Sequence, residues 1–156
     1  MTPKQQQLIR STWAAVTPIA DQAAALFYER LFTLDPALAI LFDGVEMTKQ
    51  GRMLMQTLAI VVKSIDDLPA IVPAVEALGR RHAGYGVQVR DYPTVGEALL
   101  WTLETGLGDR FTPDARRAWA HAYEILSSVM IAAAEDVERA EAMPRHAVVA
   151  GRSQAA

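Results

Sequence analysis

The sequence predicts an all-α protein, and three observations carry this prediction. Four prolines directly follow a residue whose side chain can cap a helix, which is typical of a helix start. These pairs are Thr2–Pro3, Thr17–Pro18, Asp35–Pro36 and Thr112–Pro113. Apolar residues recur every three or four positions in the segments that follow, as on the buried face of a helix. No stretch shows the strict alternation of apolar and polar residues that is typical of a strand.

The expected helices are roughly seven in number and unequal in length. The first begins at Thr2–Pro3, where Gln5 would complete a capping box. The others are expected over 18–34, 36–41, 48–64, from the region of Pro69 and Pro73 to residue 82, over 92–106 and over 113–140. Gly51 lies inside one of these segments, where glycine is unfavourable, so we expect a neighbouring helix to cross close to it.

Length and composition narrow the possible classes of protein. The 156 residues are the usual length of one domain. We expect that domain over 1–140, followed by a flexible tail over 141–156 that lacks apolar periodicity. The net charge of -3, from 15 basic and 18 acidic residues, gives no electrostatic reason to expect nucleic acid or an anionic membrane as partner.

The absence of cysteine excludes several kinds of site. Disulfides, iron–sulfur clusters, thiolate zinc sites and covalent haem attachment all require cysteine. The polar N-terminus lacks the apolar segment of a signal peptide, and the longest apolar runs are too short to span a bilayer. A cytoplasmic location is the simplest expectation.

His82 is the main candidate for a metal ligand. It ends an expected helix, and Gly84 and Gly86 after it can adopt the left-handed backbone that closes a helix C-terminus. Arg80 and Arg81 suit the negative end of the helix dipole and would also suit the carboxylates of an anionic cofactor. The alternative is that His82 is a partly exposed residue at a helix end, which is the commoner role of a lone histidine.

Seven blocks of sequence carry a family resemblance. They are Phe27–Phe32, Asp35–Asp43, Gln50–Leu54, Arg81–His82, Gly86–Val87, Tyr92–Gly96 and Ala118–Tyr123. In this order and spacing, from about residue 8 to residue 135, the chain resembles a globin. More specifically, it resembles the single-domain bacterial haemoglobins related to the haem domain of flavohaemoglobins.

The resemblance implies a globin fold around a non-covalently bound haem b. His82 would be the proximal iron ligand, and Phe42 would pack against the porphyrin. Neutral imidazole suits iron, and a flat apolar macrocycle needs aromatic and aliphatic walls. Further candidates for cofactor binding are Met53, Leu54, Leu78, Arg81, Val87, Tyr92 and Val95. Ordinary core packing would explain the apolar residues among them equally well.

The resemblance also places Tyr28 and Gln50 on the distal side, where a gas binds. Bound dioxygen carries partial negative charge, so a phenol O–H and an amide N–H aimed at it would strengthen binding. Whether either side chain ligates iron without a gas stays open. Without the resemblance, Gln50 would be read as a solvated helix residue. A bis-histidine haem is not expected, because His121 and His146 align elsewhere.

On the proximal side the sequence departs from the pattern of flavohaemoglobin-type domains. There a tyrosine and a glutamate raise the basicity of the proximal histidine. Tyr92 matches the tyrosine, but Ala134 stands where the glutamate is expected. Glu135 follows, about 100° further round a helix, and whether it substitutes stays open. The departure puts peroxidase-like or oxygen-activating behaviour in doubt.

Three functions are compatible with these features. The first is binding of O2, NO and CO, with NO dioxygenation or weak peroxidase activity if a separate reductase supplies electrons. A separate reductase is needed because the chain is too short to include flavin and nicotinamide domains. The second is a haem-based gas sensor or ligand-storage protein, and the third is a haem-free globin fold that binds other proteins. We expect a monomer or weak homodimer.

Overall fold

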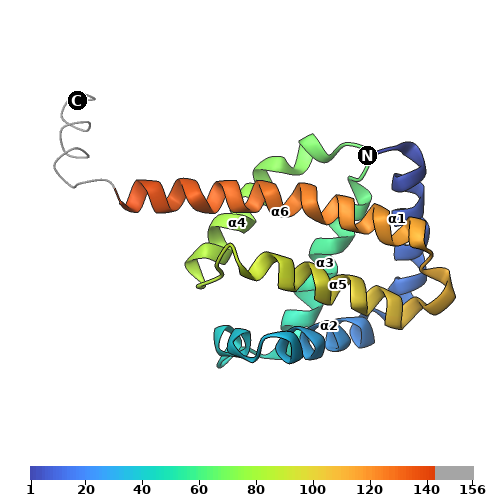
Figure 1. The fold of residues 1–156 in the computed structure, drawn as a ribbon, viewed down its shortest axis with the longest axis horizontal. Helices are drawn as coiled ribbons and strands as arrows, with labels where there is room; N and C mark the ends of the chain where they lie inside the picture. Colours follow the sequence, from blue (N-terminus) through green and yellow to red (C-terminus); the bar gives the residue numbers. More distant parts are fainter. Residues whose placement is uncertain (143–156) are drawn as a thin grey trace.

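The computed structural model describes residues 1–142, and this part of the chain is helical without a strand (Figure 1). Its α-helices are α1 (Pro3–Val16), α2 (Ala20–Leu34), α3 (Met47–Lys63), α4 (Val72–Gly84), α5 (Asp91–Leu107) and α6 (Pro113–Glu141). Its 3₁₀ helices are η1 (Thr17–Ile19), η2 (Pro36–Phe42), η3 (Leu68–Ile71) and η4 (Gly108–Arg110). The all-α prediction is confirmed, and the short seventh helix is the 3₁₀ helix η2. The tail predicted to follow α6 lies outside the described residues from residue 143 onward.

Three of the four predicted helix starts have the expected cap. The caps are Thr2, with its reciprocal partner Gln5, Asp35, which accepts from the Ala37 N–H, and Thr112, which accepts from the Ala115 N–H. The prediction at Thr17 is wrong. Its backbone is helical (φ -50°, ψ -44°) and continues α1, so its hydroxyl donates back to the Trp13 carbonyl instead of capping the next helix. As a result, α2 begins at Ala20 rather than at residue 18.

The helices pack in pairs that place α3 and α4 against different neighbours. The helix α4 packs against α6, and both α5 and α3 pack against α2. In Figure 1, α3 passes behind α5 and α6. The core between α1 and α6 contains a buried hydrogen bond of 2.8 Å from the Trp119 indole to the Thr12 hydroxyl. Because this bond satisfies two buried polar groups, it helps to fix α1 on α6.

Two glycines allow helices to cross at close range. A Cβ at Gly51 would lie 2.9 Å from the Cβ of Ala24, so the expected close crossing at Gly51 is confirmed and the neighbour is α2. A Cβ at Gly79 would lie 2.5 Å from the backbone oxygen of Met130, which brings α4 directly against the backbone of α6. Gly79 is nearly one helical turn before His82, so this crossing sets the position of His82.

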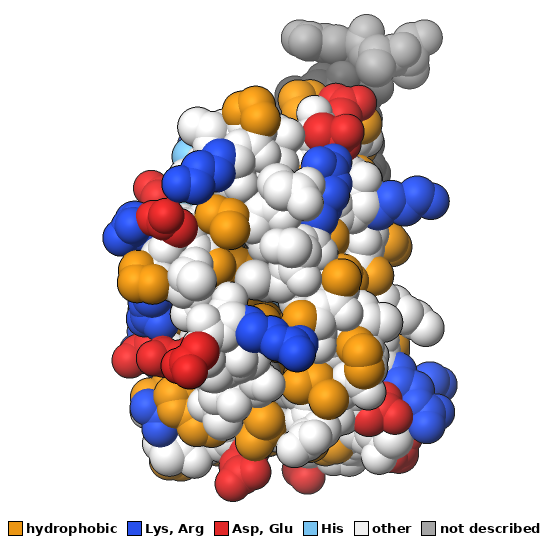
Figure 2. Space-filling view, turned by 90° about the vertical axis from the view of Figure 1, so that its right-hand side faces the viewer, with side chains coloured by type: hydrophobic (Ala, Val, Ile, Leu, Met, Phe, Trp, Pro, Cys, Tyr) orange, Lys and Arg blue, Asp and Glu red, His pale blue; other side chains and the backbone are white. Residues whose placement is uncertain are grey.

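The face in Figure 2 is the end of the molecule that carries α1 and the start of α6, and acidic and basic side chains are interspersed over it. Exposed ion pairs join Lys4 to Asp114 at 3.3 Å and Arg116 to Glu104 at 3.3 Å. Such pairs contribute little to stability individually. Among the described helices, none is both long and apolar enough to cross a membrane.

Gly79→Ala is expected to lower the free energy of unfolding by about 1–3 kcal/mol, because the added methyl group would meet backbone atoms that cannot rotate away. The matched control is Gly84→Ala in the same helix, where a Cβ would meet nothing within 4 Å. That change should leave stability unchanged or raise it by up to about 1 kcal/mol. Urea unfolding of the two variants measures the difference, and equal midpoints would contradict the close crossing.

Candidate functional site

The structure brings Tyr28 of α2 and Gln50 of α3 together. The Gln50 Nε2 donates a hydrogen bond of 3.2 Å to the Tyr28 hydroxyl oxygen. Tyr28 is 8% exposed, and burial raises the pKa of its phenol, although the bond from Gln50 lowers it. The phenol therefore keeps its proton at neutral pH. Because its oxygen accepts from Gln50, its own O–H remains available to an acceptor.

An aromatic cluster surrounds this phenol. The ring of Phe42 lies 5.3 Å from the Tyr28 ring at 66°, and Phe32 lies 5.4 Å from Phe42. Edge-to-face contacts of this kind hold rings in fixed orientations. Tyr28, Gln50 and Phe42 therefore form one group. Phe32 belongs to it but was not predicted as a site residue, although its position one turn after Tyr28 was a signal for it.

His82 lies in the last turn of α4, and its ring is held by one backbone contact. The Nδ1 atom is 2.8 Å from the Leu78 carbonyl oxygen. Because a carbonyl can only accept, Nδ1 must carry the proton, and Nε2 then has a free lone pair. Burial lowers the pKa of His82, and Arg81 lowers it further, while the bond to Leu78 raises it. Neutral imidazole with a free Nε2 is the form that binds metals.

The helix that carries His82 ends two residues later than predicted. The helix α4 continues to Gly84, which is helical, so the expected left-handed backbone at Gly84 is wrong. Gly86 alone takes that role, with a φ of 98°. The Val87 N–H donates to the His82 carbonyl at 3.0 Å and closes the helix end. This contact keeps the segment after His82 folded back against the end of α4.

Tyr92, in the first turn of α5, has a buried hydroxyl without a hydrogen-bond partner among the described residues. Burial and the charge of Asp91 raise the pKa of this phenol. The Tyr92 carbonyl accepts a hydrogen bond of 2.5 Å from the hydroxyl of Tyr123 on α6. Gly96 permits this contact, because a Cβ there would lie 2.6 Å from the Tyr123 ring. Tyr123 was missed as a residue that positions Tyr92.

A carboxylate partner for Tyr92 is not found on α6. Ala134 is buried, whereas Glu135 is exposed and lines a surface hollow with Glu138 and Arg139. The rotation of about 100° between neighbouring helix positions accounts for the difference. Glu135 therefore does not reach the Tyr92 hydroxyl in this structure.

The other predicted cofactor-binding residues differ in exposure. The half-buried apolar ones are Leu54, Leu78, Val87 and Val95. Met53 is 52% exposed and Arg81 is exposed. Among residues 1–142, neither a hydrogen bond nor a ring contact joins the group around Tyr28 to the group around His82.

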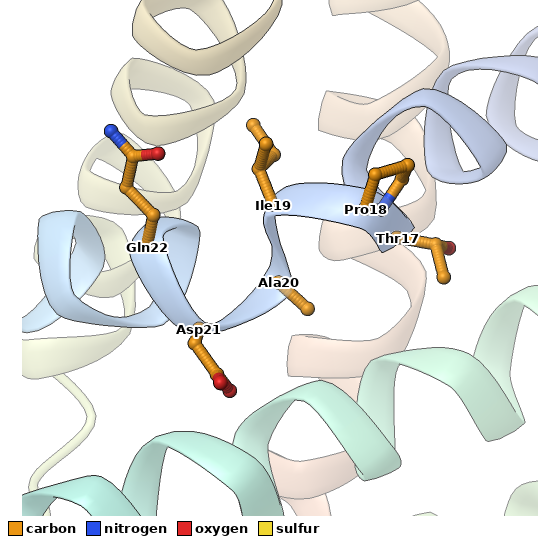
Figure 3. A pocket seen from close by; sticks show the side chains of 6 residues that line it. All are labelled: Thr17, Pro18, Ile19, Ala20, Asp21 and Gln22. Carbon is orange, nitrogen blue, oxygen red and sulfur yellow. The ribbon is translucent and has the colours of Figure 1, made fainter.

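A separate hollow lies at the corner between α1 and α2, around 17–22 (Figure 3). Asp21 and Gln22 point to opposite sides of the chain there, so they do not converge on a common ligand. None of the predicted site residues lines this hollow. It is a surface feature and not the candidate site.

Three predicted residues share an unused polar group. They are His82 with its free Nε2, Tyr28 with its free O–H, and Tyr92 with its buried O–H. A buried hydroxyl without a partner costs about 1–3 kcal/mol, so the Tyr92 hydroxyl, which has none among residues 1–142, is the strongest sign of a bound ligand. These side chains would suit a haem, for which His82 would offer a ring nitrogen, Phe42 an aromatic wall and Arg81 a cation for carboxylates.

Comparison with known proteins decides the family. The sequence model of the family described as Globin matches residues 25–130. The chain belongs to the globin family. It is 29% identical over 143 residues to the neuroglobin of Chaenocephalus aceratus, covering 83% of this globin and 90% of the relative.

Bacterial relatives are similar at the same level. The globin is 31% identical over 141 residues to the flavohemoprotein of Bacillus subtilis, covering 88% of this chain and 35% of the relative. The flavohemoprotein of Halalkalibacterium halodurans is 30% identical over 134 residues, with 84% and 32% covered. The chain thus spans about a third of the length of these flavohemoproteins. The predicted relationship to their globin part is confirmed, and membership of the family supports haem-based binding of small gases.

Tyr123→Phe tests the contact that holds Tyr92. Burial raises the pKa of Tyr123 above its ordinary value. The unfolded chain therefore releases this proton above about pH 10 while the folded protein retains it, and stability falls as pH rises past that value. At pH 7 the free energy of unfolding of the variant should be about 1 kcal/mol lower than that of wild type, because the hydrogen bond is missing. Between about pH 10 and 12, the free energy of unfolding should fall less in the variant than in wild type. Urea unfolding at a series of pH values measures this. An equal fall of the free energy of unfolding in both proteins between about pH 10 and 12 would contradict the prediction.

Proposed function

We propose that this globin binds haem b through His82 and takes up O2, NO and CO on the side of Tyr28 and Gln50. The observation that carries the proposal is the orientation of His82. Its Nδ1 is engaged by the Leu78 carbonyl, so the neutral ring presents Nε2 as a ligand. Haem, when bound, supplies an iron with one further position for a diatomic gas.

The distal residues form a donor relay toward that gas. The Gln50 N–H donates to the Tyr28 oxygen, and the Tyr28 O–H is then free to donate to the gas. Burial keeps the phenol protonated, which is the state that can donate. Phe42 and Phe32 restrict the ring of Tyr28, so little reorientation is needed when a gas arrives.

We further propose that the globin supports NO dioxygenation when a separate reductase supplies electrons. In this reaction one NO, one O2 and one electron give one nitrate ion. The likeness to flavohemoproteins and the donor groups of Tyr28 and Gln50 support this proposal. Peroxidase activity is not favoured, because His82 Nδ1 is bonded to a neutral carbonyl and Ala134 provides no carboxylate near Tyr92.

His82→Gly should abolish native haem ligation, because the other histidine among residues 1–142, His121, lies on α6 beside Gln5. Adding imidazole should restore the spectrum of the wild-type ferrous and CO forms. The control is His121→Gly on α6, where the Nδ1 lies 3.4 Å from a Gln5 side-chain oxygen. Absorption and resonance Raman spectra are the measurement. If the His82→Gly protein kept an unchanged axial-nitrogen signature, the assignment of His82 as the iron ligand would be wrong.

Tyr28→Phe should accelerate O2 dissociation by roughly 10- to 100-fold, the effect of losing one hydrogen bond to a charged acceptor of about 1.5–3 kcal/mol. The matched control, Tyr85→Phe, alters a tyrosine that is 69% exposed. It should leave the rate unchanged. Stopped-flow displacement of O2 by CO measures both rates, and equal rates in wild type and Tyr28→Phe would show that the phenol does not contact the gas.

A gas sensor or storage role differs from catalysis in one measurable respect. Consumption of NO by the oxygenated protein, repeated over many turnovers with a reductant, supports dioxygenation. Stable gas binding without turnover under the same conditions would favour the sensor or storage function instead.

A further inference from the structure

The outer side of α3 carries exposed residues that no other part of the described fold covers. We call this row of residues the α3 stripe, and its members are Lys49, Arg52, Met53, Gln56, Ala59, Ile60 and Lys63. At helical spacing they lie within an arc of about 120° and extend along about 21 Å of helix. The opposite side of α3, which includes Gly51 and Val62, is buried. The stripe is therefore a continuous outer surface of α3.

The stripe is cationic and keeps its charge. Lys49, Arg52 and Lys63 are exposed, and no acidic residue lies within the stripe. Every ion pair among residues 1–142 involves α1 or α6 instead. The carboxylate at the start of α3 belongs to Glu46, whose two oxygens accept from the Thr48 and Lys49 N–H groups at 3.0 and 2.9 Å. It is also near enough to attract the charge of Arg52, although the two do not form an ion pair. The stripe thus has the opposite sign to the whole chain, whose net charge is -3.

Two large apolar side chains lie among these cations. Met53 is 52% exposed and Ile60 is 57% exposed. Apolar residues surrounded by charges of one sign are typical of an interface with an apolar centre and a charged rim. A second copy docked stripe to stripe would bring cation against cation, so an acidic partner is the better fit.

The position of the stripe connects it to the proposed site. Gln50 follows Lys49 on the same turn of α3, and Leu54 follows Met53. We propose that the α3 stripe is the docking surface for an acidic electron-donor protein that reduces this globin. This inference rests on the proposed function, because it names the partner that the proposed dioxygenation requires. The partner recognises the stripe through carboxylates facing Lys49, Arg52 and Lys63.

The test uses reduced flavodoxin, an acidic flavin protein, as the probe. Stopped-flow mixing with the ferric globin gives a second-order rate constant of reduction, measured as ionic strength is raised. The stripe variant is Lys49→Glu/Arg52→Glu/Lys63→Glu. The control variant, Lys4→Glu/Arg116→Glu/Arg117→Glu, changes the net charge by the same amount on α1 and α6, where the wild-type cations are in ion pairs.

At low ionic strength the stripe variant should react at least about tenfold more slowly than wild type. Its rate should rise with added salt, whereas the wild-type rate should fall, because the new glutamates repel an acidic partner. The control variant should stay within about threefold of wild type, because its mutations lie outside the docking surface. Equal slowing of the two variants would overturn the proposal, since only net charge would then matter. Dithionite reduction and the CO spectrum confirm intact haem in each variant.

A second arm separates this inference from the proposed function. Fluorescence titration of flavodoxin measures binding without haem chemistry. If the globin fails to take up haem but still binds flavodoxin through the stripe, the proposed function is wrong and the docking surface stands. Vesicles of phosphatidylcholine and phosphatidylglycerol test a membrane instead. Stripe-dependent vesicle binding without flavodoxin binding would overturn the proposal. Lys49→Gln/Arg52→Gln/Lys63→Gln replaces the stripe variant if the glutamates prevent folding.

Discussion

The contact between the His82 imidazole and the Leu78 carbonyl is the interaction on which the proposed site depends. It fixes which ring nitrogen carries the proton, and it points the other nitrogen away from the helix backbone. Burial reinforces it by lowering the pKa of His82, so the ring stays neutral. The approach of α4 to the backbone of α6 at Gly79 then places this ring relative to the rest of the fold.

The contact between Tyr28 and Gln50, the proposed distal residues, depends on a second close crossing. Gly51 lets α3 approach Ala24 of α2, and the residues beside this crossing, Tyr28 and Gln50, are thereby brought within hydrogen-bonding distance. Packing and hydrogen bonding are coupled here, because a larger residue at position 51 would separate the two helices. The phenol is buried, restricted by Phe42 and left with a free O–H, which is what a weakly basic gas ligand requires.

Much of the fold could be predicted from local signals. Caps at Thr2, Asp35 and Thr112 depend on residues three or fewer positions away, so the sequence displays them directly. The prediction of a cap at Thr17 was wrong because the helical backbone of α1 continues through this residue. The crossing at Gly51 was predictable because glycine inside a helix is unfavourable without a packing reason.

The tertiary contacts of the site were less accessible to sequence analysis. Tyr123 lies 31 positions from Tyr92, and only the fold shows that its hydroxyl reaches that carbonyl. His82 was a candidate from its place at a helix end, whereas Tyr28 and Gln50 came from the family resemblance. The roles of all three toward haem stay predictions. Whether Glu135 faces the core or the solvent depends on how α6 is rotated about its axis. The sequence does not determine this rotation, and the structure shows that Glu135 is exposed.

Resonance Raman spectroscopy of the ferrous protein tests the central claim most directly. The account predicts an iron–histidine stretching band that shifts when the protein is prepared with ¹⁵N-histidine. Its frequency should be that of a neutral imidazole whose Nδ1 donates to a carbonyl. Absence of an isotope-sensitive band, or a band at the higher frequency of an imidazole bonded to a carboxylate, would contradict the account.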